Sequence, residues 1–250
     1  MHKTIASLHH PLVKHLVKLR NKKEYRSACK SALLSGLTLI EELCAKHRFK
    51  TVCLEEGYAP AFSFEADVVY RVTSAILKKI TGVVHPEPIA AEITLPEEAQ
   101  LTEVNYLLIL DGVSDPGNMG TLLRTALALG WQGALITPGS TDPFNEKALR
   151  AAKGATFKIP LKRGSWQEVD ALLKTERWML LAAMPGKTPM RELQVAPAVA
   201  LALGNEAQGL SERIRVRARA ISIPMHAEMS SLNVACAGAI LMQYIAEQNL

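Results

Sequence analysis

An α/β fold is predicted for this sequence: a C-terminal domain with a mostly parallel sheet and helices on both faces, preceded by a small α/β domain. From residue 105 onwards, short apolar runs alternate with segments of helical spacing, which is the pattern of a parallel sheet covered on both faces. Between residues 85 and 103, Pro and Glu occur together without a clear apolar period, as in a linker. We therefore expect one domain over residues 1–100, with the linker from about residue 85, and a second over residues 101–250.

The first domain carries both helical and extended patterns. Its first 30 residues hold eight Lys and Arg against one Glu, and they read either as a solvated amphipathic helix or as an RNA-binding segment. Apolar residues recur at helical spacing in LLSGLTLIEELCAKH and later in SAILKKITG. The short apolar stretches FKTVCLEE and ADVVYRVT lie between them, and this mixture predicts a small α/β domain.

The second domain begins with a clear βαβ pattern. The run YLLILD at residues 106–111 is continuously apolar and is closed by the turn DPGN, as expected of a strand buried on both faces. MGTLLRTALALG predicts a helix that ends at Gly130, and QGALITPG predicts the next strand. The alternation continues through FNEKALRAAKG (helix), ATFKIPL (strand), SWQEVDALLK (helix), WMLLAAM and AVALALG (strands), GLSERIRVR (helix), AISIP (strand) and SLNVACAGAILMQYIAEQ (terminal helix).

Composition excludes several classes of protein. With 250 residues, 48% of them hydrophobic, the chain can bury a sizeable core. Its four cysteines show no paired spacing, so we expect no metal site and a reducing compartment. No apolar run approaches the roughly 20 residues of a membrane span, and the basic N-terminus lacks a signal-peptide core, so we expect a cytoplasmic protein without membrane contact. A net charge of +5 favours a polyanionic partner.

Two turns that contain glycine follow predicted strands. In LILDGVSDPGNMGTLLRTALALG, backbone N–H groups and Asn118 form a possible anion site, with Arg124 six residues later on the helix. The alternative is an ordinary turn in which Asn118 caps the helix and Arg124 is a surface residue. In VALALGNEAQGLSE, small apolar residues end in Gly204-Asn205-Glu206, where glycine permits close approach of a ligand. This second turn lacks the GxGxxG spacing and the Walker lysine of nucleotide sites.

A third segment, ISIPMHAEMSSLNVACAGAILMQYI, joins an apolar strand to a helix that is predicted to begin near Ser230 or Ser231. Ser231 is a candidate helix cap, with Asn233 in the first turn. His226 is a candidate general base. Because a single His in a turn is more often structural or exposed, we assign it no catalytic role.

Taken together, these segments resemble the three signatures of the SpoU (TrmH-like) family of RNA 2'-O-ribose methyltransferases, in the SPOUT superfamily. The resemblance covers residues 105–250, and the opening IASLHHPLVKHLVKLRNKK with GLTLIEEL is similar to the N-terminal RNA substrate-binding domain of ribosomal-RNA members. Ala207 and Ala227 stand where the family usually has Gly, and ALLSG stands where it often has an aromatic residue leading to Glu-Gly. The signatures match Asn118, Gly120, Arg124, Thr125 and Ala126, then Gly204-Asn205-Glu206, then Ile223-Pro224-Met225 and Ser231-Leu232-Asn233-Val234.

The resemblance implies a deep trefoil knot near the C-terminus, S-adenosyl-L-methionine as the cofactor and a homodimer. It implies that the catalytic residues are Arg124, Asn118, Glu206, Ser231 and Asn233. It implies that the cofactor is held by Leu203, Gly204, Ile223, Met225 and Leu232. Candidates for binding the RNA backbone are the basic residues Lys14, Lys18, Arg20, Lys22, Lys23, Arg150 and Lys153.

The chemistry expected is methylation of a ribose 2'-hydroxyl in structured RNA, with ribosomal RNA favoured. Arginine is protonated in proteins, so Arg124 is a poor general base. We hypothesise that it binds the neighbouring phosphate and stabilises the developing alkoxide, while the phosphate or a water accepts the proton. The alternatives are a transfer-RNA substrate, a non-catalytic RNA-binding protein on the same fold, and a nucleotide-cofactor oxidoreductase, which the missing glycine fingerprint disfavours.

Overall fold

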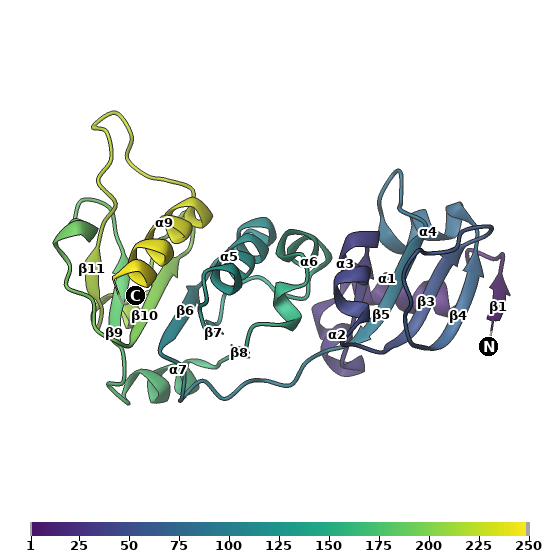
Figure 1. Cartoon of the computed structure of the whole chain (residues 1–250), viewed down its shortest axis with the longest axis horizontal. Coiled ribbons are helices and arrows are strands. Elements are labelled where there is room, and N and C mark those ends of the chain that lie inside the picture. The colour runs from purple at the N-terminus through teal and green to yellow at the C-terminus, as the bar shows by residue number, and fades with distance from the viewer. Residues whose placement is uncertain (1, 249–250) are drawn as a thin grey trace. The chain divides into compact units, whose positions relative to one another are not determined.

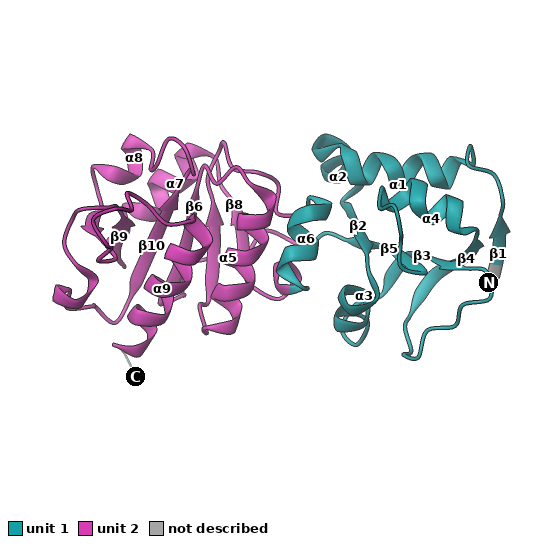
Figure 2. Cartoon of the chain, turned by 90° about the horizontal axis from the view of Figure 1, so that it is seen from above, with its two compact units in different colours: residues 1–96, 144–154 teal, residues 97–143, 155–250 magenta. Residues whose placement is uncertain are grey.

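The chain divides into two units in a computed structural model that describes residues 2–248 (Figure 2). Unit 1 comprises the residues up to Pro96 together with Phe144–Gly154, and unit 2 comprises Glu97–Pro143 and the residues from Ala155 onwards. The segment 144–154 therefore belongs to the first unit, although its sequence lies inside the stretch that we assigned to the second domain. Within the described range, no helix combines the length and the apolar character needed to cross a membrane.

Unit 1 is built on a mixed five-stranded sheet in the order β1-β4-β3-β5-β2. β4 runs parallel to both β1 and β3, whereas β5 is antiparallel to β3 and β2. α1 and α4 bury Val13, Leu16, Ile76 and Leu77 in one apolar cluster with Cys53 of β3. The strands are β1 (His2–Ile5), β2 (Ser31–Ser35), β3 (Phe49–Glu55), β4 (Ala66–Val72) and β5 (Ile89–Thr94), and the helices are α1 (Pro11–Asn21), α2 (Lys23–Cys29), α3 (Leu37–Cys44), α4 (Ser74–Thr81) and α6 (Glu146–Ala152).

Two sequence predictions in unit 1 are wrong. Residues 89–94, predicted as part of a linker, form the buried strand β5. The strand was not predicted because Glu92, in its middle, interrupts the apolar pattern. The Glu92 carboxylate is nevertheless buried and lies 3.2 Å from His15 Nε2. The helix predicted from LLSG begins later, since Leu33 and Leu34 belong to β2 and Gly36, with φ of 112°, separates this strand from α3.

Unit 2 contains a six-stranded sheet in the order β11-β9-β10-β6-β7-β8, in which every strand pair is parallel (Figure 1). The prediction of an α/β fold with a mostly parallel sheet is confirmed. The strands are β6 (Tyr106–Asp111), β7 (Gly133–Ile136), β8 (Leu161–Arg163), β9 (Met179–Ala183), β10 (Val199–Gly204) and β11 (Arg219–Ile221). The helices are α5 (Pro116–Ala128), α7 (Trp166–Leu173), α8 (Glu212–Arg215) and α9 (Val234–Glu247), with 3-10 turns η1 (Ala155–Phe157) and η2 (Met190–Glu192).

Helices cover both faces of this sheet. Because side chains alternate along a strand, Ile109 of β6 packs with Val169 of α7 and Ile214 of α8 on one face. α5 and α9 lie side by side on the other face (Figures 1 and 2). Gly238 of α9 touches Leu203 so closely there that an added Cβ would lie 2.6 Å from the leucine side chain. Both layers hold the carboxyl end of β10 in place.

One strand of unit 2 is shorter than predicted. ATFKIPL was predicted as a strand, but Ala155–Phe157 forms a 3-10 turn and β8 begins at Leu161. Ala155 and Thr156 are buried within this turn. A run of buried residues without a regular period does not distinguish the two structures.

Candidate active site

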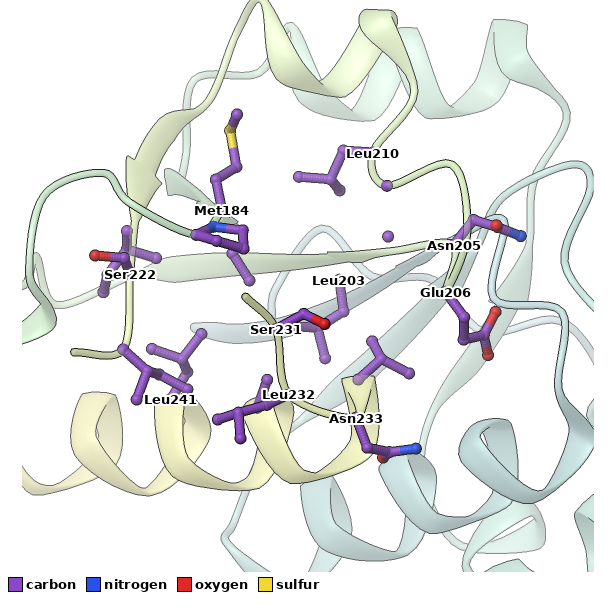
Figure 3. A pocket seen from close by; sticks show the side chains of 18 of the residues that line it. Met184, Leu203, Asn205, Glu206, Leu210, Ser222, Ser231, Leu232, Asn233 and Leu241 are labelled. Atoms are coloured by element: carbon purple, nitrogen blue, oxygen red, sulfur yellow. The ribbon is translucent and has the colours of Figure 1, made fainter. Parts of the chain in front are cut away.

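A cavity of about 570 Å³ opens in unit 2 where β9, β10 and β11 end (Figure 3). Four segments contribute to its lining: residues 183–185 after β9, 203–210 after β10, 221–225 around the end of β11, and 231–241 at the start of α9. Parallel strands end at the same edge of a sheet, and this edge is where α/β proteins bind ligands. The five residues predicted to hold the cofactor, Leu203, Gly204, Ile223, Met225 and Leu232, all line this cavity.

Other residues of the lining were not predicted from the sequence, among them Met184, Pro185, Leu210 and Leu241. No motif marks them. Met184 and Pro185 directly follow β9, so their position at the end of a parallel strand was the available signal. They add to a lining that is mostly apolar with a few polar groups, as is typical for a small organic ligand.

The turn after β10 forms one wall of the cavity. An added Cβ on Gly204 would lie 2.4 Å from the carbonyl carbon of Gly209, so no larger residue fits without moving backbone. Asn205 and Gly209 exchange two backbone hydrogen bonds of 2.9 Å. The Asn205 side chain accepts two further backbone N–H groups of the turn and donates to the Gly112 carbonyl at 2.8 Å. Asn205 therefore holds the turn closed, a role that the sequence analysis did not assign.

The two alanines that replace glycines of the family pattern, Ala207 and Ala227, impose no backbone strain. Among residues 2–248, the residues other than Gly with positive φ are Lys30, Lys153 and Glu176. Ala207 and Ala227 are not in this group, so neither has a backbone conformation that requires glycine.

Asn118 lies in the first turn of α5 and does not cap the helix, contrary to one of our two interpretations. The cap is Asp115, whose side chain accepts from the Asn118 N–H at 2.8 Å, with Pro116 as the first helical residue. The Asn118 side chain is left to bridge two other segments. Its Nδ2 donates to Glu206 Oε1 at 3.0 Å, and its Oδ1 accepts from Asn233 Nδ2 at 3.0 Å.

Glu206 is the acceptor at the end of this chain of hydrogen bonds. Besides Asn118, its carboxylate accepts from the Ser114 N–H at 3.0 Å, the Ser114 hydroxyl at 2.7 Å and the Asp115 N–H at 3.1 Å. Partial burial disfavours the charge, but the hydrogen bonds from Asn118 and Ser114 outweigh it and lower the pKa of this carboxyl from 4.5 to about 2. Glu206 is therefore ionised at neutral pH.

Asn233 caps α9, which corrects the expectation that this helix begins near Ser230 or Ser231. Its Oδ1 accepts from the Ala235 N–H at 2.9 Å and the Cys236 N–H at 3.3 Å, while its Nδ2 reaches Asn118. Ser231 precedes the helix and lines the cavity, at whose border Glu206 and Asn233 also lie (Figure 3).

Arg124 is not brought into this network. It is exposed and does not line the cavity, and its side chain makes no hydrogen bond or ion pair with the part of the chain that the structure describes. Arg124 lies six positions after Asn118, which places it about 9 Å further along α5 and on another side of the helix. His226 is exposed, 4.0 Å from Glu228, and does not line the cavity either.

The predicted RNA-binding residues all lie in unit 1, in different settings. Arg20 donates to the carbonyls of Lys79 and Ile80 at 3.0 and 2.8 Å and so caps the last turn of α4. Arg150 is held 2.8 Å from Glu146. The remaining five are exposed on α1, α2 and α6 or at their ends: Lys14, Lys18, Lys22, Lys23 and Lys153.

These features define a class of protein: an α/β protein that binds a small organic ligand at the carboxyl edge of a parallel sheet, beside an ionised carboxylate and two amides. No group of three or more His, Cys, Asp or Glu in residues 2–248 is arranged to hold a metal ion. The chain belongs to the SpoU rRNA methylase family, whose family model matches residues 105–243. A second model, the MRM3-like substrate binding domain, matches residues 10–91.

Relatives with assigned activities match most of the chain. The chain is 32% identical to the 23S rRNA (guanosine(2553)-2'-O)-methyltransferase RlmP of Bacillus subtilis, over 97% of this chain and 99% of the relative. It is 31% identical to the 23S rRNA (guanosine-2'-O-)-methyltransferase RlmB of Xylella fastidiosa, over 73% of this chain and 79% of the relative. The crystal structure of an AdoMet-bound rRNA methyltransferase from Sinorhizobium meliloti superposes with a TM-score of 0.86 at 26% identity, covering 100% of this chain and 99% of that chain.

Proposed function

We propose that this chain transfers a methyl group from S-adenosylmethionine to a ribose 2'-hydroxyl in ribosomal RNA. The observation that carries the proposal is that the five predicted cofactor residues and the Glu206–Asn118–Asn233 hydrogen bonds meet at one cavity. Family membership and relatives that act on 23S rRNA support it. Such an enzyme would act in the cytoplasm, where ribosomal RNA is available.

The cavity suits the cofactor in size and in chemistry. Its volume of about 570 Å³ lies within the range of small-molecule sites. Gly204 lets the 204–210 turn close on itself beside the cavity, because a side chain there would collide with Gly209. Leu203, Ile223 and Leu232 would enclose the apolar parts of the ligand, with backbone groups of the turn as hydrogen-bonding partners.

When bound, S-adenosylmethionine supplies an electrophilic methyl group. Glu206 is ionised and accepts four hydrogen bonds, so it orients Asn118 instead of accepting a proton. The amides of Asn118 and Asn233, with the hydroxyl of Ser231, would position the ribose, and much of the rate acceleration can come from such positioning. Arg124 would bind the adjacent phosphate and stabilise the developing alkoxide.

We propose further that two chains associate through the face formed by α5 and α9. Arg124 is exposed on α5 and is absent from the cavity of its own chain. Ile240 on α9 is a large apolar side chain that is 40% exposed. A homodimer through this face would cover Ile240 and bring Arg124 to the partner's RNA site. The deep trefoil knot that the family resemblance implies is also part of this proposal, and it would include segments 204–210 and 222–233, which contribute to the cavity.

Unit 1 would bind the RNA backbone. Lys14 and Lys18 lie one turn apart on α1 and are exposed, and Lys22 and Lys23 follow directly. Phosphate contacts of this kind provide affinity and register, whereas the shape of the folded RNA provides selection.

The test is transfer of labelled methyl from S-adenosylmethionine to RNA from a strain that lacks this protein, comparing the wild type with Arg124→Ala. We expect an alkali-resistant 2'-O-methyl linkage in ribosomal RNA with the wild type and its loss in the variant. Label in transfer RNA alone would replace the ribosomal substrate with the transfer-RNA alternative. Cofactor and RNA binding without label in either RNA would favour the non-catalytic alternative.

A further inference from the structure

A buried carboxylate lies directly behind the cavity wall. Asp111, the last residue of β6, is 2% exposed and does not line the cavity. Its Oδ1 accepts from the Thr137 hydroxyl at 3.0 Å and its Oδ2 accepts from the Ser211 backbone N–H at 2.7 Å. Burial of a carboxylate is unfavourable unless its oxygens are hydrogen-bonded, so these contacts explain how the charge is tolerated there.

Asp111 holds both ends of the cavity turn. Gly204, where β10 ends and the turn begins, is paired with Asp111 in the register of β10 and β6. Ser211, where the turn ends, donates its backbone N–H to the same residue. The residues between these two points, 205–210, all line the cavity. A shift of the Asp111 carboxylate would therefore move the end of the turn relative to its beginning.

Thr137 fixes the orientation of this carboxylate. The residue directly follows β7 and is buried. Its hydroxyl oxygen accepts from the Gly112 N–H at 3.1 Å. Its proton has two acceptors within reach, Asp111 Oδ1 at 3.0 Å and the Pro138 carbonyl at 3.4 Å, and the carboxylate is the nearer one. Gly112 in turn accepts from Asn205 through its carbonyl, at 2.8 Å. The same small group of atoms thus connects the ends of β6 and β7 with both sides of the cavity turn.

We infer that Asp111 and Thr137 are positioning residues for the cofactor, acting through the 204–211 turn without touching the ligand. The inference rests on the proposed function, because it takes S-adenosylmethionine as the ligand of the cavity. It assigns a role to two buried polar residues at the ends of β6 and β7 that do not line the cavity.

The test compares Thr137→Val with Thr137→Ser. Valine keeps the volume and removes the hydroxyl, whereas serine keeps the hydroxyl. Ser140→Ala is the matched control, because the Ser140 hydroxyl donates to the neighbouring Leu110 carbonyl at 3.0 Å and does not contact Asp111. S-adenosylmethionine binding is measured by calorimetry, and KM and kcat are measured with RNA as the acceptor.

We expect Thr137→Val to raise the Kd and the KM for S-adenosylmethionine about tenfold, the size expected when one hydrogen bond to a charged group is lost. We expect kcat at saturating cofactor to change less than about twofold, and Thr137→Ser and Ser140→Ala to behave as the wild type. An unchanged Kd in Thr137→Val, or an equal rise in Ser140→Ala, would overturn the inference.

Two further outcomes are decisive. If Thr137→Val does not fold, Asp111→Asn takes its place. This variant keeps one oxygen for the Ser211 N–H and removes the charge, and an unchanged Kd would equally overturn the inference. If the wild type binds no S-adenosylmethionine, the proposed function itself fails and the inference fails with it. If the wild type binds the cofactor and the variant binds it equally well, only the inference fails.

Discussion

Replacing Glu206 by Gln tests the central hydrogen bonds of the site. The carboxylate accepts four hydrogen bonds, two on each oxygen, from Ser114, Asp115 and Asn118. A Gln side chain has one oxygen, so two donors lose their partner and face an amino group instead. Each hydrogen bond to a charged group contributes about 1.5–3 kcal/mol, and exposure of Glu206 reduces this to about 1 kcal/mol. The expected loss of hydrogen-bond free energy is therefore about 2 kcal/mol for the two donors together.

This loss should appear in catalysis, because Glu206 orients the Asn118 amide at the edge of the cavity. A change of about 2 kcal/mol corresponds to roughly a 30-fold lower rate of methyl transfer, measured with ribosomal RNA at saturating S-adenosylmethionine. Glu228→Gln is the matched control, since Glu228 is exposed and its nearest charged partner is His226 at 4.0 Å. A Glu206→Gln enzyme whose rate lies within about twofold of the wild type, or an equal loss of rate in the control, would contradict this role of Glu206.

The same carboxylate predicts a dependence of stability on pH. Its pKa is about 2 in the folded chain against an ordinary value of 4.5, so its contribution is complete above pH 4.5 and is lost as the pH falls towards 2. Since the group is exposed, solvent screening reduces this contribution to about 2 kcal/mol, the same figure as for the two hydrogen bonds that a Gln side chain would lose. The free energies of urea unfolding of wild type and Glu206→Gln should differ by this amount between pH 5 and 7, and the difference should shrink as the pH falls from 4.5 towards 2. A difference that stays constant down to pH 2 would show that the ionised form is not the stabilising one.

Three other perturbations follow from the structure. Arg124→Ala should lower kcat more than 100-fold. Arg124→Lys should restore little of this activity, because a lysine does not reproduce bidentate phosphate binding. Near-normal turnover by the Lys variant would contradict a role of Arg124 in bidentate phosphate binding. Gly204→Ala should abolish cofactor binding in calorimetry, since its Cβ would lie 2.4 Å from backbone, and a Kd like that of the wild type would show that the turn can shift at no cost. Simultaneous change of Lys14, Lys18 and Lys22 to Ala should weaken RNA binding and make it less dependent on salt. The slope of log K against log salt concentration should fall in magnitude by up to about three. An unchanged slope would show that these residues do not contact the RNA backbone.

The periodic parts of the fold could be predicted from the sequence. β6 and β10 are continuous apolar runs because they are central in a sheet covered on both faces. β5 could not be found in the same way, since its middle residue, Glu92, is a buried charge that depends on His15 from another element. Such a pair is formed by tertiary structure and leaves no pattern within the strand itself.

The candidate site shows a similar division. The resemblance to the family identified residues that the structure brings to one cavity, but it did not identify which side chains cap the helices. Asp115 and Asn118 are both good caps and lie three residues apart, and Pro116 as the first helical residue was the signal that favours Asp115. Met184 and Pro185 have no motif, because an apolar lining is defined by position at the sheet edge.

The assignment of the caps determines what the two site amides can do. Because Asp115 caps α5, the Asn118 side chain can donate to Glu206 and accept from Asn233. Asn233 accepts from the first N–H groups of α9 with its oxygen, so its amino group must point to Asn118. If either amide were rotated by half a turn, its oxygen would face another acceptor and its amino group would face another donor. The ionised carboxylate of Glu206 accepts at one end and the N-terminus of α9 donates at the other, and hydrogen bonds connected in this way reinforce one another. The charge of Glu206 therefore orients the Asn118 amide, and the N-terminus of α9 orients the Asn233 amide that donates to it. This is why a group that is unsuited to accept a proton still matters to the site.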